Sequence, residues 1–281
     1  MSLMIAKILT TSIIKQRTNK LTEAAALIVD DISGCLDRED ETSQSNNLTN
    51  IINKSCDMPV QIYGAAHGVG NPAAGSIAAV TALQSVLYDV NKYIGEYARD
   101  DYDFADLADR ISENADHAVR QQLAAYYGLR AGTGLSWLLI EDDVAYTYSL
   151  GNSDIFLYRA DKLYKITSSI ENSTQDTHLG YRAHEGRIIP QNLNRMPLQI
   201  GDIIIIAGRN FSEKVDQFDL EAKLGDLGAF SGVSALIEEM LADAGGSVAV
   251  VVCKVSAIND QIPAPAVKSE RKVKHSKIRK M

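Results

Sequence analysis

The sequence predicts an α+β fold, in which a central β-sandwich of two antiparallel sheets is flanked by α-helices on both sides. Three observations favour it. Runs of strand-like segments and runs of helix-like segments follow one another, whereas a parallel α/β sheet would alternate them. The segment after residue 130 alternates apolar and polar residues across short turns. The last strand-like segment is apolar throughout, which indicates cover on both of its faces.

The first half of the chain supplies strands and two long helices. Residues 5–14, 24–32 (AAALIVDDI) and 60–66 are predicted strands, and the polar residues 33–59 a long loop. Apolar residues recur at helical spacing from residue 72 to about 93 and again over 103–127. Pro72 suits the first turn of a helix, because a proline there loses no hydrogen bond.

The second half of the chain predicts a meander and then a closing strand. Residues 134–167 read as about four antiparallel strands, and residues 168–197 as irregular. GDIIIIAG (201–208) is a predicted buried strand and SGVSALIEEMLADAG (231–245) a predicted helix. SVAVVVCKV (247–255) is the closing strand.

Composition is that of an ordinary globular protein, with 46% hydrophobic and 23% charged residues among 281. Its three cysteines, Cys35, Cys56 and Cys253, have neither zinc-site spacing nor the density of a disulfide framework. This usage suits a reducing compartment, so we predict a cytoplasmic protein. Continuous apolar stretches such as residues 203–207 fall far short of the ~20 residues that span a bilayer, so no membrane association is expected.

Charge divides the chain into two parts. Residues 262–281 contain seven Lys or Arg and one Glu, a net charge of +6, whereas the remaining 261 residues carry −14. We predict a folded domain over residues 1–261 and a disordered basic tail over 262–281. Three roles stay open for the tail: a solvated extension, a segment that folds back on the acidic body, or a ligand for an anionic partner. Nucleic acid is not expected to bind outside the tail.

A glycine-rich segment, AAHGVGNPAAG (65–75), joins the third strand to the first long helix. Such a turn brings bare backbone N–H groups towards a ligand. Gly68 to Ala73 fit the G-x-G-x-x-A pattern of dinucleotide sites, which also needs a second strand ending in an acid about 20 residues on. Asp89 stands at that distance but inside the predicted helix, and a second helix follows. No Gly-Lys-Ser/Thr follows either, so a nucleotide site is disfavoured.

When the whole chain is considered, the same segment resembles a segment of a phosphatase family. AAHGVGNPAAGSIAA is similar to the ADGMGGHxAGExAS segment of the metal-dependent serine/threonine phosphatases, the protein phosphatase 2C (PP2C) family. Further segments resemble that family's motifs in the same order: AGTGL (131–135), LGNSDIFLYR (150–159), THLG (177–180), LQIGDIIIIA (198–207) and GSVAVVV (246–252). The resemblance covers residues 5 to 256. It implies the same β-sandwich, and bacterial members of the family act on phosphoserine and phosphothreonine in proteins.

The resemblance also implies a metal site, which in the family consists of carboxylates around two Mn²⁺ or Mg²⁺ ions that activate a bridging water. Four positions of this sequence align with metal-binding aspartates: Leu21, His67, Arg209 and Gly246. None is an acid, and Arg209 adds a permanent cation. A single imidazole at His67 cannot hold two oxygen-preferring ions, and a hydrogen-bonding role in the turn is favoured for it.

We therefore predict a catalytically degenerate PP2C-like protein, a pseudophosphatase without a metal cofactor, that binds or regulates another protein, including a phosphorylated one. Lys20 and Arg209, together with the N–H groups of Gly68 and Gly70, are the candidate anion-binding groups. One alternative is an active Mn²⁺- or Mg²⁺-dependent phosphatase that takes its ligands from Glu23, Asp30 or Asp57. Another is a scaffold that docks through its basic tail.

Overall fold

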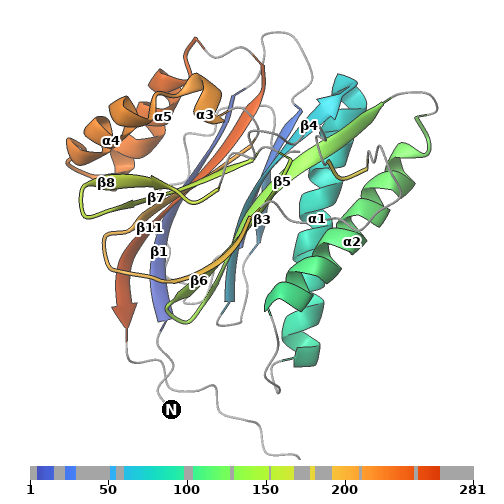
Figure 1. Cartoon of the computed structure of the whole chain (residues 1–281), viewed down its shortest axis with the longest axis horizontal. Helices are drawn as coiled ribbons and strands as arrows, with labels where there is room; N and C mark the ends of the chain where they lie inside the picture. The colour runs from blue at the N-terminus through green and yellow to red at the C-terminus, as the bar shows by residue number, and fades with distance from the viewer. Residues whose placement is uncertain are drawn as a thin grey trace, which may run out of the picture.

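Two β-sheets pack face to face, and helices cover both outer faces, as the sequence predicts (Figure 1). The computed structural model describes residues 5–15, 23–29, 51–54, 60–97, 104–126, 130–151, 153–167, 178–180, 192–208, 211–243 and 246–259. The predicted tail over 262–281 lies outside them.

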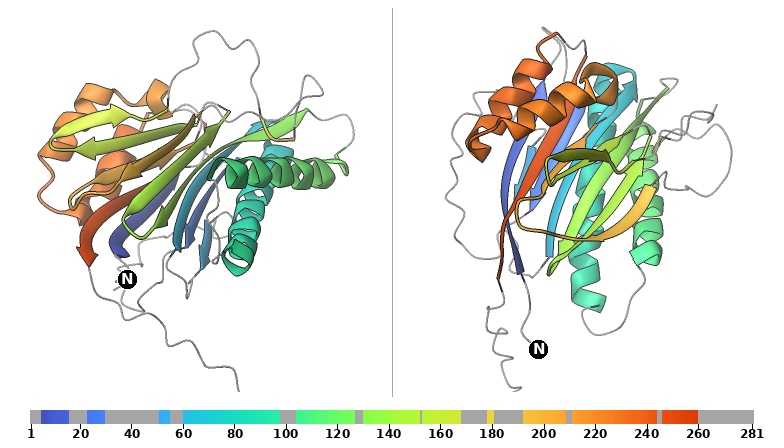
Figure 2. Two further views of the ribbon diagram at one scale, coloured as in Figure 1. Left: turned by 60° about the horizontal axis from the view of Figure 1, so that its bottom comes forward. Right: turned by 60° about the vertical axis from the view of Figure 1, so that its left-hand side comes forward.

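One sheet has five strands within the described residues, and all of its neighbours are antiparallel. Its spatial order is β1 (Ile5–Lys15), β11 (Val248–Asn259), β10 (Ile203–Ala207), β7 (Asp154–Arg159) and β8 (Lys162–Lys165). Its outer face is covered by α3 (Phe211–Lys214), α4 (Gln217–Gly225), the short 3₁₀ helix η2 (Phe230–Gly232) and α5 (Val233–Met240) (Figure 2).

The other sheet has six described strands. Its spatial order is β3 (Ile51–Lys54), β2 (Ala24–Val29), β4 (Val60–Gly70), β5 (Ala131–Glu141), β6 (Val144–Leu150) and β9 (Asn192–Pro197). The β2–β3 pair is parallel, so the predicted purely antiparallel arrangement is wrong at this edge. Helices α1 (Pro72–Tyr97) and α2 (Phe104–Leu123) cover the outer face of this sheet.

Apolar side chains form three layers between these elements. The central layer lies between the sheets, where Ile204, Ile206 and Val251 face Tyr63 and Leu138. The two outer layers lie under α1 and α2 and under α3 to α5. Because strands such as β10 contribute to two layers, nearly all of their residues are buried, which explains their continuous apolar sequence.

The structure corrects three details of the prediction. The meander is divided between the sheets, since β5 and β6 belong to one and β7 and β8 to the other. Strands β3 and β9 lie within stretches that we expected to be irregular. Sequence periodicity could not find them, because both are short strands at sheet edges and β9 is largely exposed.

Helix α1 contains the one segment of the described chain, Pro72–Val90, that is long and apolar enough to cross a membrane. This segment is no continuous run of large apolar residues, because alanine, serine and threonine interrupt them. In this fold 56% of the segment is buried, and α1 packs on the six-stranded sheet and α2, as a core helix does.

An ion pair fixes the start of β10. The guanidinium of Arg159 donates to both carboxylate oxygens of Asp202, at 2.7 and 2.6 Å, and to the carbonyl of Pro197 at 2.8 Å. Hydrogen bonding to Asp202 raises the pKa of Arg159. Asp202 is only 1% exposed and also accepts the N–H of Gln199, so the pair holds the β9–β10 turn.

Removing the carboxylate should therefore destabilise the protein. We expect Asp202→Ala to lower the free energy of unfolding by about 3 kcal/mol, because it leaves a partly buried cation without its partner. Urea denaturation measures this. Asp219→Ala, which breaks a surface pair with Lys223, is the control and should change stability little. An Asp202→Ala variant as stable as the control would contradict this role.

The interface of α1 and α2 contains a buried carboxyl group. Asp89 is 6% exposed, and its Oδ1 accepts from the amide of Asn114 at 3.0 Å. Among the described residues, Oδ2 has no hydrogen-bond partner. Burial raises the pKa of Asp89, although Asn114, Lys92 and Arg110 act in the opposite direction. The folded state thus favours the protonated form of this group.

Asp89→Asn should consequently stabilise the protein at neutral pH. The contribution of a carboxyl group with a raised pKa is complete below its unfolded pKa and is lost as the pH rises through its folded pKa. Asparagine keeps a neutral side chain at every pH, so the gain should be present at pH 7 and disappear on acidification. Urea unfolding at both pH values, with the exposed Glu113→Gln as control, measures it. A gain that is equal at the two pH values would contradict the argument.

Candidate functional site

In the glycine-rich segment, strand β4 and helix α1 approach each other closely. Residues 68–70 continue β4 and pair with β5, so the predicted turn is wrong and the chain turns only at Asn71. A Cβ on Gly68 would lie 2.2 Å from the carbonyl oxygen of Gly75 in the first turn of α1. Gly68 is therefore required by packing of α1 on β4.

Local groups already use the backbone donors of this segment. The N–H of Gly68 donates to the carbonyl oxygen of Glu23 at 2.7 Å. Asn71 caps α1, because its Oδ1 accepts from the N–H groups of Ala73 and Ala74 at 3.1 and 3.2 Å. The expectation that the N–H of Gly68 faces an anion is therefore wrong. Gly70 adopts φ +87° against the carbonyl of Arg130, so backbone geometry accounts for this glycine.

Glu23 lies at the same end of the sandwich. Its carbonyl contacts Gly68, and its own N–H donates to the Ser247 hydroxyl at 3.4 Å. It immediately precedes β2, which pairs with β4 so that Ala24 is opposite His67. From the sequence, Glu23 was predicted only as an alternative ligand, and Ser247 was not predicted at all. The signal for Glu23 was its position as the last acid before the apolar run AAALIV.

His67 lies between the two sheets. Its register partners in the six-stranded sheet are Ala24 and Gly134. Across the sandwich it faces Gly208, since a Cβ built on Gly208 would be 3.1 Å from the His67 Cβ. His67 is buried among small residues and is only 8% exposed. It therefore lies in the fold as an internal side chain and not at the tip of a turn.

Gly246 lies on the adjoining segment, directly before Ser247 and β11. Its φ of +90° is a conformation that L side chains rarely adopt. A Cβ there would be 3.6 Å from Lys214 Nζ. Together with the hydrogen bond from Gly208 N–H to Ala249, these contacts bring the positions of His67, Gly208 and Gly246 to one end of the sandwich.

Other predicted site residues lie outside the described residues. They are Lys20, Leu21 and Arg209, together with the alternative ligands Asp30 and Asp57. Their roles stay predictions. Gly208 and Phe211, which flank Arg209, are described. The N–H of Gly208 donates to the carbonyl of Ala249 in β11, and Phe211 begins α3.

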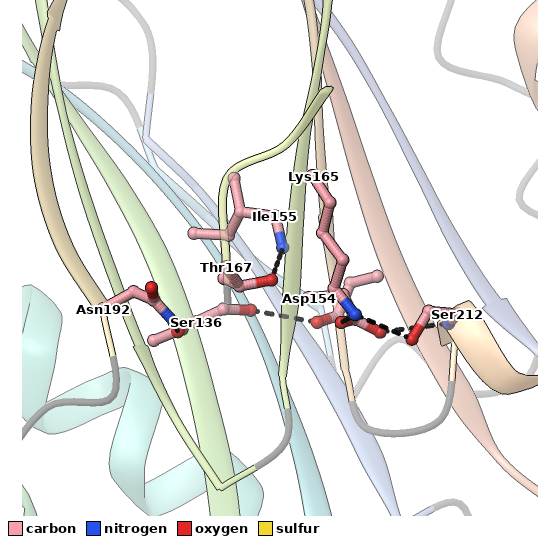
Figure 3. A network of polar contacts seen from close by, with 9 residues as sticks. Ser136, Asp154, Ile155, Lys165, Thr167, Asn192 and Ser212 are labelled. Carbon is pink, nitrogen blue, oxygen red and sulfur yellow. Dashed lines mark hydrogen bonds and ion pairs between the residues drawn. The ribbon is translucent and has the colours of Figure 1, made fainter. Parts of the chain in front are cut away.

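Polar contacts hold these flanks from behind (Figure 3). The hydroxyl of Ser136 on β5 lies 3.3 Å from the carbonyl of Ala65 and donates across the sandwich to Ala207 at 3.1 Å. Asp154 accepts from the N–H of Ser212 at 3.0 Å and pairs with Lys165 at 2.8 Å. Lys165 also donates to the Ser212 hydroxyl at 3.1 Å. These bonds tie the end of β10 and the start of α3 to both sheets.

The described side chains do not fit a pair of divalent ions. No group of three or more His, Cys, Asp or Glu side chains comes together within the described residues. Among the described residues near the positions that align with the family's metal site, Glu23 and His67 carry such groups, Asp154 lies behind them and is already paired with Lys165, and Gly246 has no side chain. Two Mg²⁺- or Mn²⁺-class ions need several anionic oxygens, which this end of the described fold does not offer.

Comparisons with known proteins agree on the fold. No family model and no curated protein matches the sequence. Among solved structures, PppA, described as a key regulatory component of T6SS in Pseudomonas aeruginosa, is similar with a TM-score of 0.62 and 15% identity, over 89% of this chain and 99% of that one. The catalytic domain of the serine/threonine phosphatase PstP in complex with two manganese ions has a TM-score of 0.60 and 17% identity, over 90% and 100%.

A third similar structure includes the PP2C phosphatase domain of SpoIIE from Bacillus subtilis, with a TM-score of 0.57 and 13% identity, over 92% of this chain and 64% of that one. The chain thus has the fold of the bacterial PP2C-like phosphatases, as the sequence resemblance implied. Identities this low establish the fold and leave the chemistry to the residues of the site.

The packing of Gly68 on α1 can be tested by adding one methyl group. Gly68→Ala should lower the free energy of unfolding by about 3 kcal/mol, because backbone atoms of Gly75 fill the space. Gly228→Ala is the matched control, since nothing lies within 4 Å of its added Cβ; we expect a change within about 0.5 kcal/mol. Thermal and urea denaturation measure both. Equal stability of the two variants would show that the close approach is not limiting.

Proposed function

We propose that the chain is a catalytically degenerate PP2C-like protein that binds or regulates another protein. The observation that carries the proposal is the donor set at the site. His67 and Gly246 stand at two of the aligned aspartate positions, and the described residues contain no metal-binding cluster. The two other aligned positions, Leu21 and Arg209, carry no acid in the sequence either. Without carboxylates, no water can be activated by the family's two-metal mechanism.

The fold does not need the metals for its stability, which is why such a module can persist. Its three apolar layers are complete, and the site end is held by backbone contacts and by the Ser136 and Asp154 hydrogen bonds. A preserved fold with an altered site is suited to recognition without turnover.

The partner we propose is a protein, and a phosphorylated one is the first to test. Lys20 and Arg209 are the cations that would pair with a phosphoryl group, since guanidinium and ammonium groups bind phosphate oxygens through charge-assisted hydrogen bonds. The backbone N–H of Gly68 takes no part, because Glu23 accepts it. We retain the cytoplasm as the proposed location, on the cysteine usage alone.

A second candidate function is an active, divergent phosphatase, and one observation favours it. The backbone of Glu23 contacts Gly68 and Ser247, and the next residue, Ala24, is opposite His67. One carboxylate-bearing residue therefore lies near the positions where metal ligands would be needed. Asp30 and Asp57 would then have to complete the site. The two candidate functions make opposite predictions for catalysis.

A p-nitrophenyl phosphate assay with added Mn²⁺ separates the two functions. The proposal predicts no turnover above the rate without protein, with or without a chelator, because the donor set for two ions is incomplete. Glu23→Gln is the matched variant and should leave this background unchanged. Turnover that needs Mn²⁺ and falls in Glu23→Gln would overturn the proposal and support the active phosphatase.

A further inference from the structure

The outer face of α3, α4 and α5 carries the largest excess of negative charge among the described helices. Residues 211–243 contain eight acidic and two basic residues, a net charge of −6. Helices α1 and α2 together carry −3 over a longer stretch of chain. Seven of the eight acids on the first surface are exposed: Glu213, Asp216, Asp219, Asp226, Glu238, Glu239 and Asp243.

One lysine compensates part of this charge. Lys223 bonds to Asp219 at 3.3 Å and to Glu239 at 3.1 Å, which joins α4 to α5. Glu221 accepts the backbone N–H of Leu163 at 2.7 Å. Beside these acids Phe218 is 85% exposed, the most exposed of the large hydrophobic side chains described. The surface thus combines acidic groups with an apolar anchor, which suits a basic segment that also contains apolar residues.

The chain has such a segment in residues 262–281. Its net charge is +6, equal and opposite to that of the α3–α5 surface, and Val273 and Ile278 lie among its basic residues. We propose that residues 262–281 dock on the α3–α5 surface of the same molecule. The inference goes beyond the proposed function, since it concerns the exposed acids of α3 to α5 and not the aligned metal positions, and would hold for an active or an inactive protein.

The position at which the described chain ends allows this contact. The C-terminal end of α4 lies over β7, where a Cβ on Gly225 would be 3.2 Å from the Tyr158 hydroxyl. Tyr158 is in register with Ile203, and Ile203 with Lys254 on β11. Asn259 ends β11 five residues later, which is about 17 Å along the strand. Figure 2 shows this strand in the sheet that α3 to α5 cover.

The segment is long enough to reach the whole surface. Lys268, its first basic residue, is nine residues beyond Asn259 and can reach about 30 Å from it in an extended chain. The later basic residues reach farther. Attraction between the opposite charges would be strongest at low ionic strength, because salt screens exposed charges beyond about 10 Å at 0.1 M.

Backbone amide chemical shifts of the full-length protein test the contact. The variant Lys272→Gln/Lys274→Gln/Lys277→Gln should shift amides of α4 and α5 relative to wild type and leave those of α2 unchanged. The same α4 and α5 amides should move when about 0.5 M NaCl is added to wild type, and the variant should no longer show that response. Absence of shifts in α4 and α5, or equal shifts in α2, would overturn the proposal.

Zero-length carbodiimide cross-linking of wild type gives a second, independent readout. Lysines of residues 262–281 should link to acids of α4 and α5 in preference to Asp106 or Glu113 of α2, and high salt should abolish the links. The links should persist on dilution, because the contact is intramolecular. Links that disappear on dilution would assign the surface to a second copy of the chain and contradict docking in the same molecule.

Discussion

The close approach of α1 to β4 at Gly68 is the constraint on which the site end of the molecule depends. Only a hydrogen atom fits between Gly68 and the backbone of Gly75, and the N–H of Gly68 goes to Glu23. One residue therefore fixes a helix, its strand and the start of β2. These backbone contacts place the segments that carry the positions aligned with the family's metal site.

Our proposal requires a fold that persists without metal ligands, and this separation of scaffold and site provides one. The three apolar layers stabilise the sandwich without help from the site, and Ser136 and the Asp154–Lys165 pair satisfy polar groups behind it. The described site positions carry a buried histidine and glycines with restricted backbone conformations. Function in such a molecule depends on a few side chains, which a structural similarity at 11–17% identity cannot supply.

Much of the fold could be predicted from the sequence because burial leaves a strong pattern. The run Ile203–Ala207 and the apolar stretch after Ser247 indicated doubly covered strands, and the helical spacing after Pro72 indicated α1. Edge strands β3 and β9 left no such pattern. The GVG segment suggested a turn, whereas its glycines serve close packing and pairing in β4, a tertiary contact that local sequence does not report. Proximity of Glu23 to Gly68 and Ser247 likewise depends on long-range pairing.

We propose that the site end of the sandwich cannot hold two divalent ions, and crystals of the full-length protein grown with manganese test this most directly. An anomalous difference map should show no pair of peaks near Glu23 and His67. A two-metal centre has its ions about 4 Å apart. Two peaks at that spacing near Glu23 and His67, with carboxylates around them, would contradict the proposed loss of activity and support an active phosphatase.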